Sequence, residues 1–420
     1  MERCGRWHPR RSGDGATVGL RVISITAQLP YGATEPFLIP ELEELKRQGC
    51  EVTVVPVRPR GDVVHGGAAE LLRDSVSLPL LSGAIVRAAL AETIRSPRTV
   101  VKAFLSVCRS RSGRILVKNL SVFPKALWLA HLARRRGADH LHAHWASTPA
   151  TLALVAGEVS NIPWSFTAHR WDIAENNLLR LKARRACFAR AISGHGAHEL
   201  AAVVNDSSWE PWVLHVGVPV PAPHAPAGPD RPFRVVTAAR LVEKKGHVHL
   251  IEAVKRVKAG GVQVRTELAG DGPLVDQLRR QVQDAGLGED VVFLGGLPHE
   301  DLMQEMTSGR WHAAVLPSVV TPAGQLEGIP VSLIEAMACG LPVISTATGG
   351  IPELLEDGAG LLVPPADPEA LARGLERLAS DPGLRKSLGD AGRKRVEQAF
   401  SVEAVAAALR ERLHDCSGRT

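Results

Sequence analysis

Residues 321–350 read TPAGQLEGIPVSLIEAMACGLPVISTATGG and are the most informative stretch of this chain. Their pattern predicts a loop, a helix, a tight turn and a buried strand. Glu327 lies just before the expected helix, and Glu335 lies about one and a half turns inside it. Two acids at this spacing also occur on ordinary surface helices, so the pair carries weight only together with the rest of the string.

The start of this helix is expected to bind an anion. Pro330 suits the first helical position, because its missing N–H would be unpaired there anyway. The amides of Val331, Ser332 and Leu333 would then point outward from a positive helix end, where phosphate is a common ligand. Carboxylates nearby repel a bare phosphate, so a ligand that also carries hydroxyl groups, such as a nucleotide sugar, fits the stretch better.

Length and composition indicate a globular protein of two or three domains. The chain has 420 residues, of which 45% are hydrophobic and 22% charged. No apolar run approaches the roughly 18–20 residues of a membrane-spanning helix. The RR pair at 10–11 is not followed by an apolar stretch, so we expect no secretion signal and a disordered basic tail over residues 1–17. The six scattered cysteines are typical of reduced thiols in a cytoplasmic protein.

Charge is distributed unevenly along the chain. The first 225 residues hold 28 Lys and Arg against 18 Asp and Glu, whereas the remainder holds 22 against 26. A basic first half indicates an anionic surface or substrate nearby, although a solvated excess of charge without any partner gives the same count.

Short apolar runs alternate with helical patterns in both halves, which predicts an α/β protein with parallel sheets covered by helices. In the first half the expected strands are residues 20–26, 51–57, 140–145, 163–169 and 188–193. In the second half they are residues 233–240, 263–270, 291–296, 312–318 and 342–348. A turn with Gly or Pro and then a helix follows each strand, so we expect two doubly wound units.

A proline-rich stretch marks the boundary between these units. Residues 218–232 hold six prolines and are interpreted as a linker between a first domain (18–217) and a second domain (233–400). Residues 401–420 are expected to form a final helix and tail, with Ser401 as the N-cap. This helix either completes its own domain or crosses back to the first.

Residues 83–136 combine apolar helical stretches with many basic side chains. These are Arg87, Arg95, Arg98, Lys102, Arg109, Arg111, Arg114, Lys118, Lys125 and Arg134–Arg136. A helix with an apolar stripe and a basic flank lies on an anionic membrane or simply packs on its own sheet, and the sequence leaves both interpretations open.

Two further segments are candidates for binding the phosphate groups of a ligand. Arg240 closes an expected strand, and Lys245 follows it before Gly246 and a helix. At the carboxyl end of a parallel strand such a basic pair would neutralise a diphosphate, although an Arg and a Lys also occur together on plain surfaces. Gly270 and Gly272 end another strand, where a ligand can approach the backbone closely or the chain simply turns.

The second half of the chain resembles the donor-binding domain of family 4 glycosyltransferases. These are retaining enzymes of the GT-B fold, with two facing Rossmann-like domains and an interdomain cleft. The resemblance covers residues 233–400 and rests on AARLVEKKG, AGDGP, LPS and the stretch from EGIPVSLIEAMACG to LLVPPADPEALA. The first half is similar to a subgroup that acts in exopolysaccharide and cell-surface glycan assembly, at residues 34–49, 140–153 and 165–173.

This resemblance implies a role for each matching residue. Glu327 and His169 would be catalytic, with Glu327 near the donor sugar and His169 near the anomeric carbon. Glu335 would hold the ribose hydroxyls, while Arg240 and Lys245 would grip the diphosphate. The donor-binding residues it implies are Arg240, Lys245, Gly270, Gly272, Gly328, Ile329, Val331, Ser332, Leu333 and Glu335.

The acceptor side departs from the pattern of the family. The resemblance places Gly32, Thr34, Glu35 and Asp172 there, but the usual Ser-Glu-Thr-Phe is replaced by ATEPF at residues 33–37. Two prolines, at 36 and 40, restrict the start of the following helix, and the second could not lie deep within it. Acceptor specificity is therefore the least defined part of the prediction.

The resemblance implies no metal and no cofactor, because the nucleotide sugar is a co-substrate. Cationic side chains and helix dipoles would do the work of a metal, and the leaving diphosphate would help to deprotonate the acceptor. His140, His142 and His144 alternate on a strand, but no acidic or Cys partner stands at ligand spacing, so we do not expect them to chelate a metal. The expected partners are a nucleoside diphosphate sugar, for example a UDP-sugar, a hydroxyl acceptor and an anionic membrane touched peripherally at its inner face, with no nucleic acid.

Several functions remain open at this point. The leading hypothesis is a glycosyltransferase that acts on a glycan or a lipid-linked glycan intermediate. A soluble natural product such as an aminoglycoside intermediate is the alternative acceptor. A nucleotide-sugar 2-epimerase has a similar fold but lacks the EGIPVSLIEA arrangement, and a non-catalytic protein that binds sugar nucleotides would not need all of Arg240, Lys245, Glu327, Glu335 and His169.

Overall fold

The computed structural model describes residues 19–32, 35–63, 66–80, 82–222 and 232–418 of the chain. It divides into two compact units. Unit 1 comprises Met1–His215 and Val405–Thr420, and unit 2 comprises Val216–Ala404. The expected disordered tail, residues 1–17, and the middle of the expected linker, residues 223–231, lie outside the described residues.

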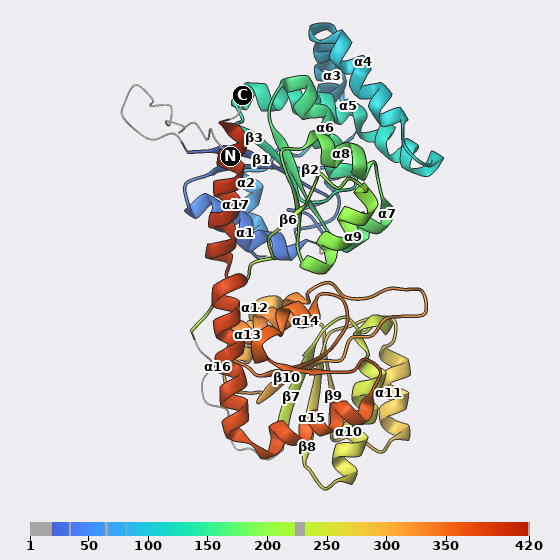
Figure 1. The fold of residues 1–420 in the computed structure, drawn as a ribbon, viewed down its shortest axis with the longest axis vertical. Coiled ribbons are helices and arrows are strands. Elements are labelled where there is room, and N and C mark those ends of the chain that lie inside the picture. The colour runs from blue at the N-terminus through green and yellow to red at the C-terminus, as the bar shows by residue number, and fades with distance from the viewer. Residues whose placement is uncertain (1–18, 33–34, 64–65, 81, 223–231, 419–420) are drawn as a thin grey trace. The chain divides into compact units, whose positions relative to one another are not determined.

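Unit 1 contains a six-stranded parallel sheet in the order β2-β1-β3-β4-β5-β6 (Figure 1). Its strands are β1 (Arg21–Thr26), β2 (Glu51–Pro56), β3 (His140–Ala143), β4 (Trp164–Ala168), β5 (Ala189–Ala191) and β6 (Trp212–Val213). Its helical segments are η1 (Pro36–Leu38), α1 (Ile39–Arg47), α2 (Gly66–Arg73), α3 (Gly83–Arg95), α4 (Pro97–Cys108), α5 (Gly113–Arg136), α6 (Thr148–Ser160), α7 (Arg170–Glu175), α8 (Leu179–Arg185) and α9 (Gly194–Val204). The final helix, α17 (Val402–Ser417), completes the unit.

Alternation along the strands gives this sheet two different faces. Ile23 and Ile25 of β1 pack with α3, α4, α5 and α6 in an apolar cluster. Val22 points the other way, toward α1, α2 and α17. In α17, Leu409 and Leu413 are fully buried in this second cluster, and Ser401 accepts a hydrogen bond from the Ala404 amide at 3.2 Å. The last helix therefore packs on unit 1.

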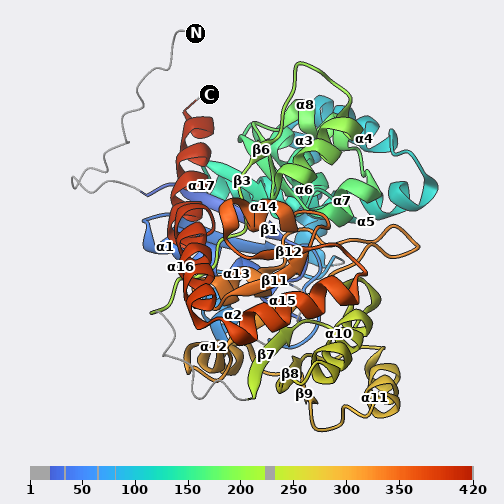
Figure 2. The same cartoon turned by 60° about the horizontal axis from the view of Figure 1, so that its bottom comes forward.

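Unit 2 contains a second six-stranded parallel sheet, in the order β12-β11-β10-β7-β8-β9. Its strands are β7 (Phe233–Ala238), β8 (Val264–Ala269), β9 (Val291–Gly295), β10 (Ala313–Leu316), β11 (Val343–Thr346) and β12 (Leu361–Val363). Its helical segments are η2 (Glu243–Lys245), α10 (His247–Ala259), α11 (Val275–Asp284), α12 (His299–Thr307), α13 (Val331–Ala338), α14 (Ile351–Leu354), η3 (Glu356–Gly358), α15 (Pro368–Ser380) and α16 (Pro382–Ala399). One face is covered by α10, α11 and α15, the other by α12, α13, α14 and α16, and α10 lies beside α11 (Figure 2).

The ten strands expected from the sequence coincide with strands of the structure, so the prediction of two doubly wound α/β units is confirmed. The start of the expected linker differs from the prediction, because Val218 is buried and packs in unit 2, where its amide donates to the Phe400 carbonyl at 2.8 Å. Pro40 is the second residue of α1, where a missing amide costs nothing. Among the described residues, none of the helices combines the length and apolar content that crossing a bilayer requires.

Candidate functional site

The strand order of unit 2 reverses between β7 and β10, and this reversal defines its switch point. β8 and β9 follow β7 on one side, while β10, β11 and β12 lie on the other. The loops that leave β7 and β10 run in opposite directions at the carboxyl edge, where ligands bind in open α/β sheets. Lys244 and Lys245 lie in the turn after β7, and Glu327 lies in the loop after β10. The fold thus brings together residues some eighty positions apart, since Lys245 and Glu327 are separated by 82.

A cluster of three charges occupies this position. The Lys244 Nζ lies 2.7 Å from Oε1 of Glu327, and the Lys245 Nζ lies 3.0 Å from Oε2. The side chains of Glu327 and Lys245 are 8% and 15% exposed, and that of Lys244 is 32% exposed. Burial alone raises the pKa of Glu327, but the two ammonium groups outweigh burial and hold that pKa below its usual value. Burial lowers the pKa of Lys245, and the carboxylate opposes part of this shift.

Two glycines hold the loops of this cluster in place. Gly246 has φ +70°, and a Cβ there would meet the Pro317 carbonyl oxygen at 1.8 Å. Gly349, after β11, has φ +55°, and a Cβ there would meet the Glu327 carbonyl oxygen at 1.8 Å. A side chain at either position would push one of the charged loops away. Neither glycine was singled out in the sequence as a site residue.

The helix after Glu327 differs in one respect from the prediction. Pro330 is the N-cap, with φ −69° and ψ 119°, and α13 begins at Val331. The Leu333 amide donates to the Pro330 carbonyl at 3.1 Å, so the expectation that this amide is free was wrong. Within the described part of the chain, only the Val331 and Ser332 amides of the three have no backbone acceptor.

The residues around this helix start divide into two groups. A Cβ on Gly328 would meet no heavy atom within 4 Å, so this position borders open space. The side chains of Ile329, Val331 and Leu333 pack in the core of unit 2 instead. Ile329 and Val331 therefore offer a ligand mainly their backbone, whereas the Leu333 amide is already bonded to the Pro330 carbonyl.

Glu335 pairs with a histidine that the sequence analysis did not single out. His299, the first residue of α12, places Nε2 2.7 Å from Oε1 of Glu335. The hydrogen bond to Glu335 raises the pKa of His299 above its ordinary value, and burial opposes part of this shift. The histidine side chain is 53% exposed and that of Glu335 is 11% exposed, so solvent reaches the pair from the histidine side.

The glycines after β8 serve the backbone more than a ligand. A Cβ on Gly270 would meet the Ala239 carbonyl oxygen at 1.9 Å, and one on Gly272 would meet the Leu241 carbonyl oxygen at 2.5 Å. The loops after β7 and β8 therefore pack directly on one another, which explains why both positions lack a side chain. Arg240 lies in the first of these loops with an exposed side chain, and its carbonyl is 3.1 Å from His247 Nε2.

His169 in unit 1 follows β4 and lies beneath aromatic rings. Its ring centroid is 4.3 Å from that of Trp145 and 5.5 Å from that of Phe37. Burial lowers the pKa of His169 to about 3, so the imidazole is neutral at pH 7. Its Nε2 is buried and has no hydrogen-bond partner among the described residues.

Asp172 is enclosed by the protein, which differs from the expectation that it faces an acceptor. It is 3% exposed, and its Oδ2 accepts from the amides of Ala146 at 3.0 Å and His169 at 3.2 Å. Burial raises the pKa of Asp172 to about 6. Lys182, also fully buried, donates to the Ala146 and Ser147 carbonyls at 2.7 Å each. Asp172 fixes the segment that carries His169.

Glu35 is likewise turned inward. Its carboxylate accepts from three consecutive amides, those of Ala27 at 3.0 Å, Gln28 at 2.6 Å and Leu29 at 2.8 Å, and from the indole N–H of Trp145. These bonds tie the loop after β1 to the loop after β3, across the switch point of unit 1. The nearby Gly32 has φ +72°. The other residue expected on the acceptor side, Thr34, lies outside the described residues.

His140 and His142 of β3, and His144 directly after it, are buried and neutral. His142 places both ring nitrogens against hydroxyl groups, those of Ser165 at 2.8 Å and Thr167 at 2.9 Å. His140 contacts the same Ser165 hydroxyl at 2.8 Å, and burial lowers the pKa of His140 to about 3. His144 lies 3.8 Å from Glu41, which itself pairs with the buried Arg190 at 2.8 Å. In the part of the chain that the structure describes, no three His, Cys, Asp or Glu side chains are placed to hold a metal.

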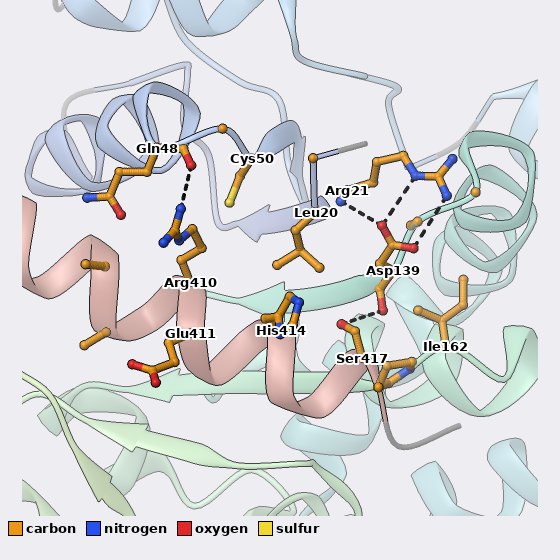
Figure 3. A pocket seen from close by; sticks show the side chains of 18 of the residues that line it. Leu20, Arg21, Gln48, Cys50, Asp139, Ile162, Arg410, Glu411, His414 and Ser417 are labelled. Atoms are coloured by element: carbon orange, nitrogen blue, oxygen red, sulfur yellow. Dashed lines mark hydrogen bonds and ion pairs between the residues drawn. The ribbon is translucent and has the colours of Figure 1, made fainter. Parts of the chain in front are cut away.

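A cavity of about 1210 Å³ lies at the opposite end of the unit 1 strands (Figure 3). Its walls include Arg21, Asp139 and, from α17, Arg410. The Arg21 guanidinium is engaged by Asp139, and Arg410 donates to the Gln48 carbonyl at 2.9 Å. Because this cavity borders the amino ends of the strands, it is not where ligands bind in sheets of this kind.

Comparison with known proteins gives a family match for unit 2, the unit that carries the cluster of Lys244, Lys245 and Glu327. Residues 224–395 match the family described as glycosyl transferases group 1. The matched residues span most of unit 2. The match confirms, for this part of the chain, the resemblance to family 4 glycosyltransferases found in the sequence.

Two relatives match the chain in part. The amylovoran biosynthesis glycosyltransferase AmsK of Erwinia amylovora is 38% identical over 172 residues, which is 41% of this chain and 42% of that protein. A GDP-mannose-dependent alpha-(1-6)-phosphatidylinositol monomannoside mannosyltransferase of Mycolicibacterium smegmatis is 35% identical over 166 residues, which is 39% of this chain and 43% of the relative. The chain thus matches less than half the length of these two relatives.

A solved structure extends the likeness to both units. The Anabaena protein Alr3699/HepE, crystallised in complex with UDP, superposes with a TM-score of 0.69 over 94% of this chain and 100% of that one, at 18% identity. At this level of identity the likeness concerns the fold alone. The fold is the expected GT-B class, with two Rossmann-like units.

Proposed function

We propose that this protein is a retaining glycosyltransferase, which transfers a sugar from a nucleoside diphosphate sugar to a hydroxyl of a glycan or a lipid-linked glycan intermediate. The observation that carries the proposal is the cluster of Lys244, Lys245 and Glu327 at the switch point of a group 1 domain. The activities named for the two relatives, amylovoran biosynthesis and mannosyl transfer to a phosphatidylinositol monomannoside, support a glycan or glycolipid acceptor.

The ion cluster supplies a way to bind and release a diphosphate. A phosphate oxygen is a negatively charged acceptor, as a carboxylate oxygen is, so it can replace Glu327 as the partner of Lys244 and Lys245. Glu327 would then be free to accept hydrogen bonds from sugar hydroxyls. As the glycosidic bond breaks, negative charge develops on the diphosphate, and lysines already in position stabilise it without reorganisation. Arg240 would add a third cation.

The remaining donor contacts follow from the helix start and from the Glu335 pair. The Val331 and Ser332 amides would bind phosphate oxygens at the positive end of α13. Glu335 would accept hydrogen bonds from the ribose hydroxyls, with His299 as the partner that the ribose displaces or shares. Gly270, Gly272 and Ile329 would shape the walls through their backbone.

In unit 1, we propose that His169 acts by hydrogen bonding and not by taking the acceptor proton. A base whose pKa is about 3 is too weak to remove a proton from a sugar hydroxyl at pH 7. The leaving diphosphate is a stronger base than His169 and would take the acceptor proton. Because the acceptor would then attack from the face that the diphosphate leaves, the product keeps the anomeric configuration. Glu35 and Asp172 would position the loops around His169 without touching the acceptor. The proposed mechanism uses no metal and no cofactor.

A nucleotide-sugar panel tests this proposal. A ligand at about one hundred times its Kd stabilises the folded state by about 2.7 kcal/mol, so the correct donor should raise the melting temperature clearly. Turnover of that donor with EDTA present should be unchanged, and NMR of the first product should find the donor's anomeric configuration. A panel in which no nucleotide sugar shifts the melting temperature would contradict donor binding, and an inverted product would contradict retention.

A further inference from the structure

The basic segment noted in the sequence forms a compact helical layer on unit 1. Residues 83–136 hold twelve Lys and Arg but a single acid, Glu92. The other residues up to 225 hold 16 basic and 17 acidic side chains, so the whole positive excess of the first half lies in this segment. Glu92 is 2% exposed and pairs with Arg134, so its charge is hidden.

Two helices of this layer, α3 and α4, expose apolar side chains on their outer faces. In Figure 1 they lie beside α5 at the margin of unit 1. The exposed apolar residues are Val86, Leu90, Ile94, Val101, Phe104 and Leu105, and we call this set the α3–α4 face. Leu90 is 61% exposed and Ile94 is 73% exposed, values unusual for large aliphatic side chains in a folded domain.

The helical spacing places these residues in stripes. At about 100° per residue, Val86, Leu90 and Ile94 fall within an arc of about 80°. On the opposite side of α3, Ile85 and Ala88 are buried in the apolar cluster of the sheet. The helix is therefore apolar on two sides, and only one of them has a partner in the described structure.

Basic side chains border each stripe on one side. Arg98 and Lys102 of α4, and Arg109 just after it, are exposed and follow the stripe of Val101 and Leu105 around the helix. In α3, Arg87 has the same relation to its stripe. Phe104 is held by an edge-to-face contact with Phe123 of α5, at 5.5 Å between ring centroids. Each stripe is thus apolar, exposed and flanked on one side by positive charge.

We propose that the α3–α4 face docks unit 1 on an anionic lipid surface. Aliphatic side chains enter the boundary between headgroups and acyl chains, while arginine and lysine at the border pair with lipid phosphates. Charge argues against a second copy of the chain, because two such faces would bring like charges together. Exposed aliphatic residues do not stack on bases, which argues against a nucleic acid. This surface does not rest on the proposed sugar transfer, although it would bring a lipid-linked acceptor to the enzyme.

Vesicle sedimentation of the full chain tests the proposal. The protein should pellet with vesicles of phosphatidylcholine and phosphatidylglycerol, should bind pure phosphatidylcholine far less, and should be released by salt. Leu90→Glu should lower the partition coefficient severalfold, whereas Leu362→Glu, at an exposed apolar position of β12, should not. No pelleting with the anionic vesicles would overturn the proposal, as would equal effects of these two variants.

A charge-matched pair separates the face from the net charge of the chain. Arg87→Glu, Arg98→Glu and Lys102→Glu together should lower binding about tenfold or more. The control, Lys255→Glu, Arg280→Glu and Lys394→Glu, changes the net charge equally at exposed positions of unit 2 and should bind as the wild type does. Equal losses in both triples would mean that net charge alone attracts the protein, and Leu90-dependent self-association without vesicle binding would assign the face to a second copy. Unchanged melting temperatures establish that the variants are folded.

Discussion

The two units each use a glutamate to tie together the loops that diverge at the switch point, and they hold its carboxylate in different ways. In unit 1, the described hydrogen bonds that Glu35 accepts come from neutral groups, three backbone amides and an indole. In unit 2, Glu327 faces two ammonium groups on flexible side chains. Both sheets are parallel and six-stranded with a switch point, but their strand orders differ, and so do the partners of the carboxylate.

This difference separates a structural carboxylate from one that can exchange partners. Backbone amides cannot leave Glu35 without unfolding the loop, so the bonds persist whatever binds nearby. Lysine side chains can turn from Glu327 to a phosphate at little conformational cost, because their ammonium groups need only an anionic partner. A glutamate at the switch point therefore serves architecture in one unit and, by our proposal, ligand exchange in the other.

The largest expected effect comes from removing an exchangeable cation. Lys245→Ala should lower turnover about 10²-fold or more, because one preorganised group that stabilises transition-state charge is lost. Steady-state kinetics with the donor found by the panel measures the effect. The matched control is Lys258→Ala, which breaks an exposed ion pair between Lys258 of α10 and Asp290. This variant should leave turnover unchanged. Near-normal kinetics for Lys245→Ala would remove this lysine from the diphosphate site.

The second prediction exchanges the two glutamates for glutamine. Glu35→Gln should destabilise unit 1 by about 1–3 kcal/mol, because a carboxamide cannot accept all the bonds that the buried carboxylate receives. Glu327→Gln should lower turnover with a smaller loss of stability, since Lys244 and Lys245 retain contact with water. Urea unfolding followed by circular dichroism, beside donor turnover, measures both effects. The comparison between the units fails if Glu327→Gln is the more destabilising variant.

The sequence predicted the fold well because apolar runs and turn residues are local signals. All ten expected strands are present. The two that were missed, β6 (Trp212–Val213) and β12 (Leu361–Val363), are short edge strands, which need no long apolar run because only one side of each pairs. The proline-rich boundary was also visible, yet Val218 packs in the core of unit 2 because a neighbouring proline does not prevent burial.

The site was predictable residue by residue but not as a set of contacts. Lys245 and Glu327 were both singled out, but their pairing depends on where two distant loops meet. Lys244 was passed over because adjacent lysines look alike in a sequence, although its Nζ is as close to the carboxylate. Gly349 and Gly350 follow β11, and two adjacent glycines at the end of a strand indicate that another backbone segment passes close by. The sequence could therefore have predicted the contact between Gly349 and the loop of Glu327. Asp172 misled, because no local pattern distinguishes an acid that binds backbone amides from one that faces a ligand.

The smallest expected effect concerns the pair of His299 and Glu335. This pair is intermediate between the Glu35 and Glu327 sites, because its partner is a charged side chain but one that is only partly buried. The pKa of His299 is raised above its usual 6.5 by Glu335. The pair therefore contributes its stability fully below the unfolded pKa and loses it as the pH rises through the higher folded pKa. Because the histidine is about half exposed, this contribution should be below about 1 kcal/mol.

NMR titration of the His299 ring measures the shift directly, and Glu335→Gln should lower the pKa toward 6.5, because burial is then opposed only by the charge of Glu300. If Glu335 also binds the ribose, protonated His299 competes for the same carboxylate, so donor affinity should rise a few-fold as the pH passes the His299 pKa. His299→Ala should abolish this pH dependence, while Glu335→Ala should weaken donor binding at every pH. A donor affinity that Glu335→Ala leaves unchanged would remove Glu335 from the ribose site and leave the pair with a structural role, as in unit 1.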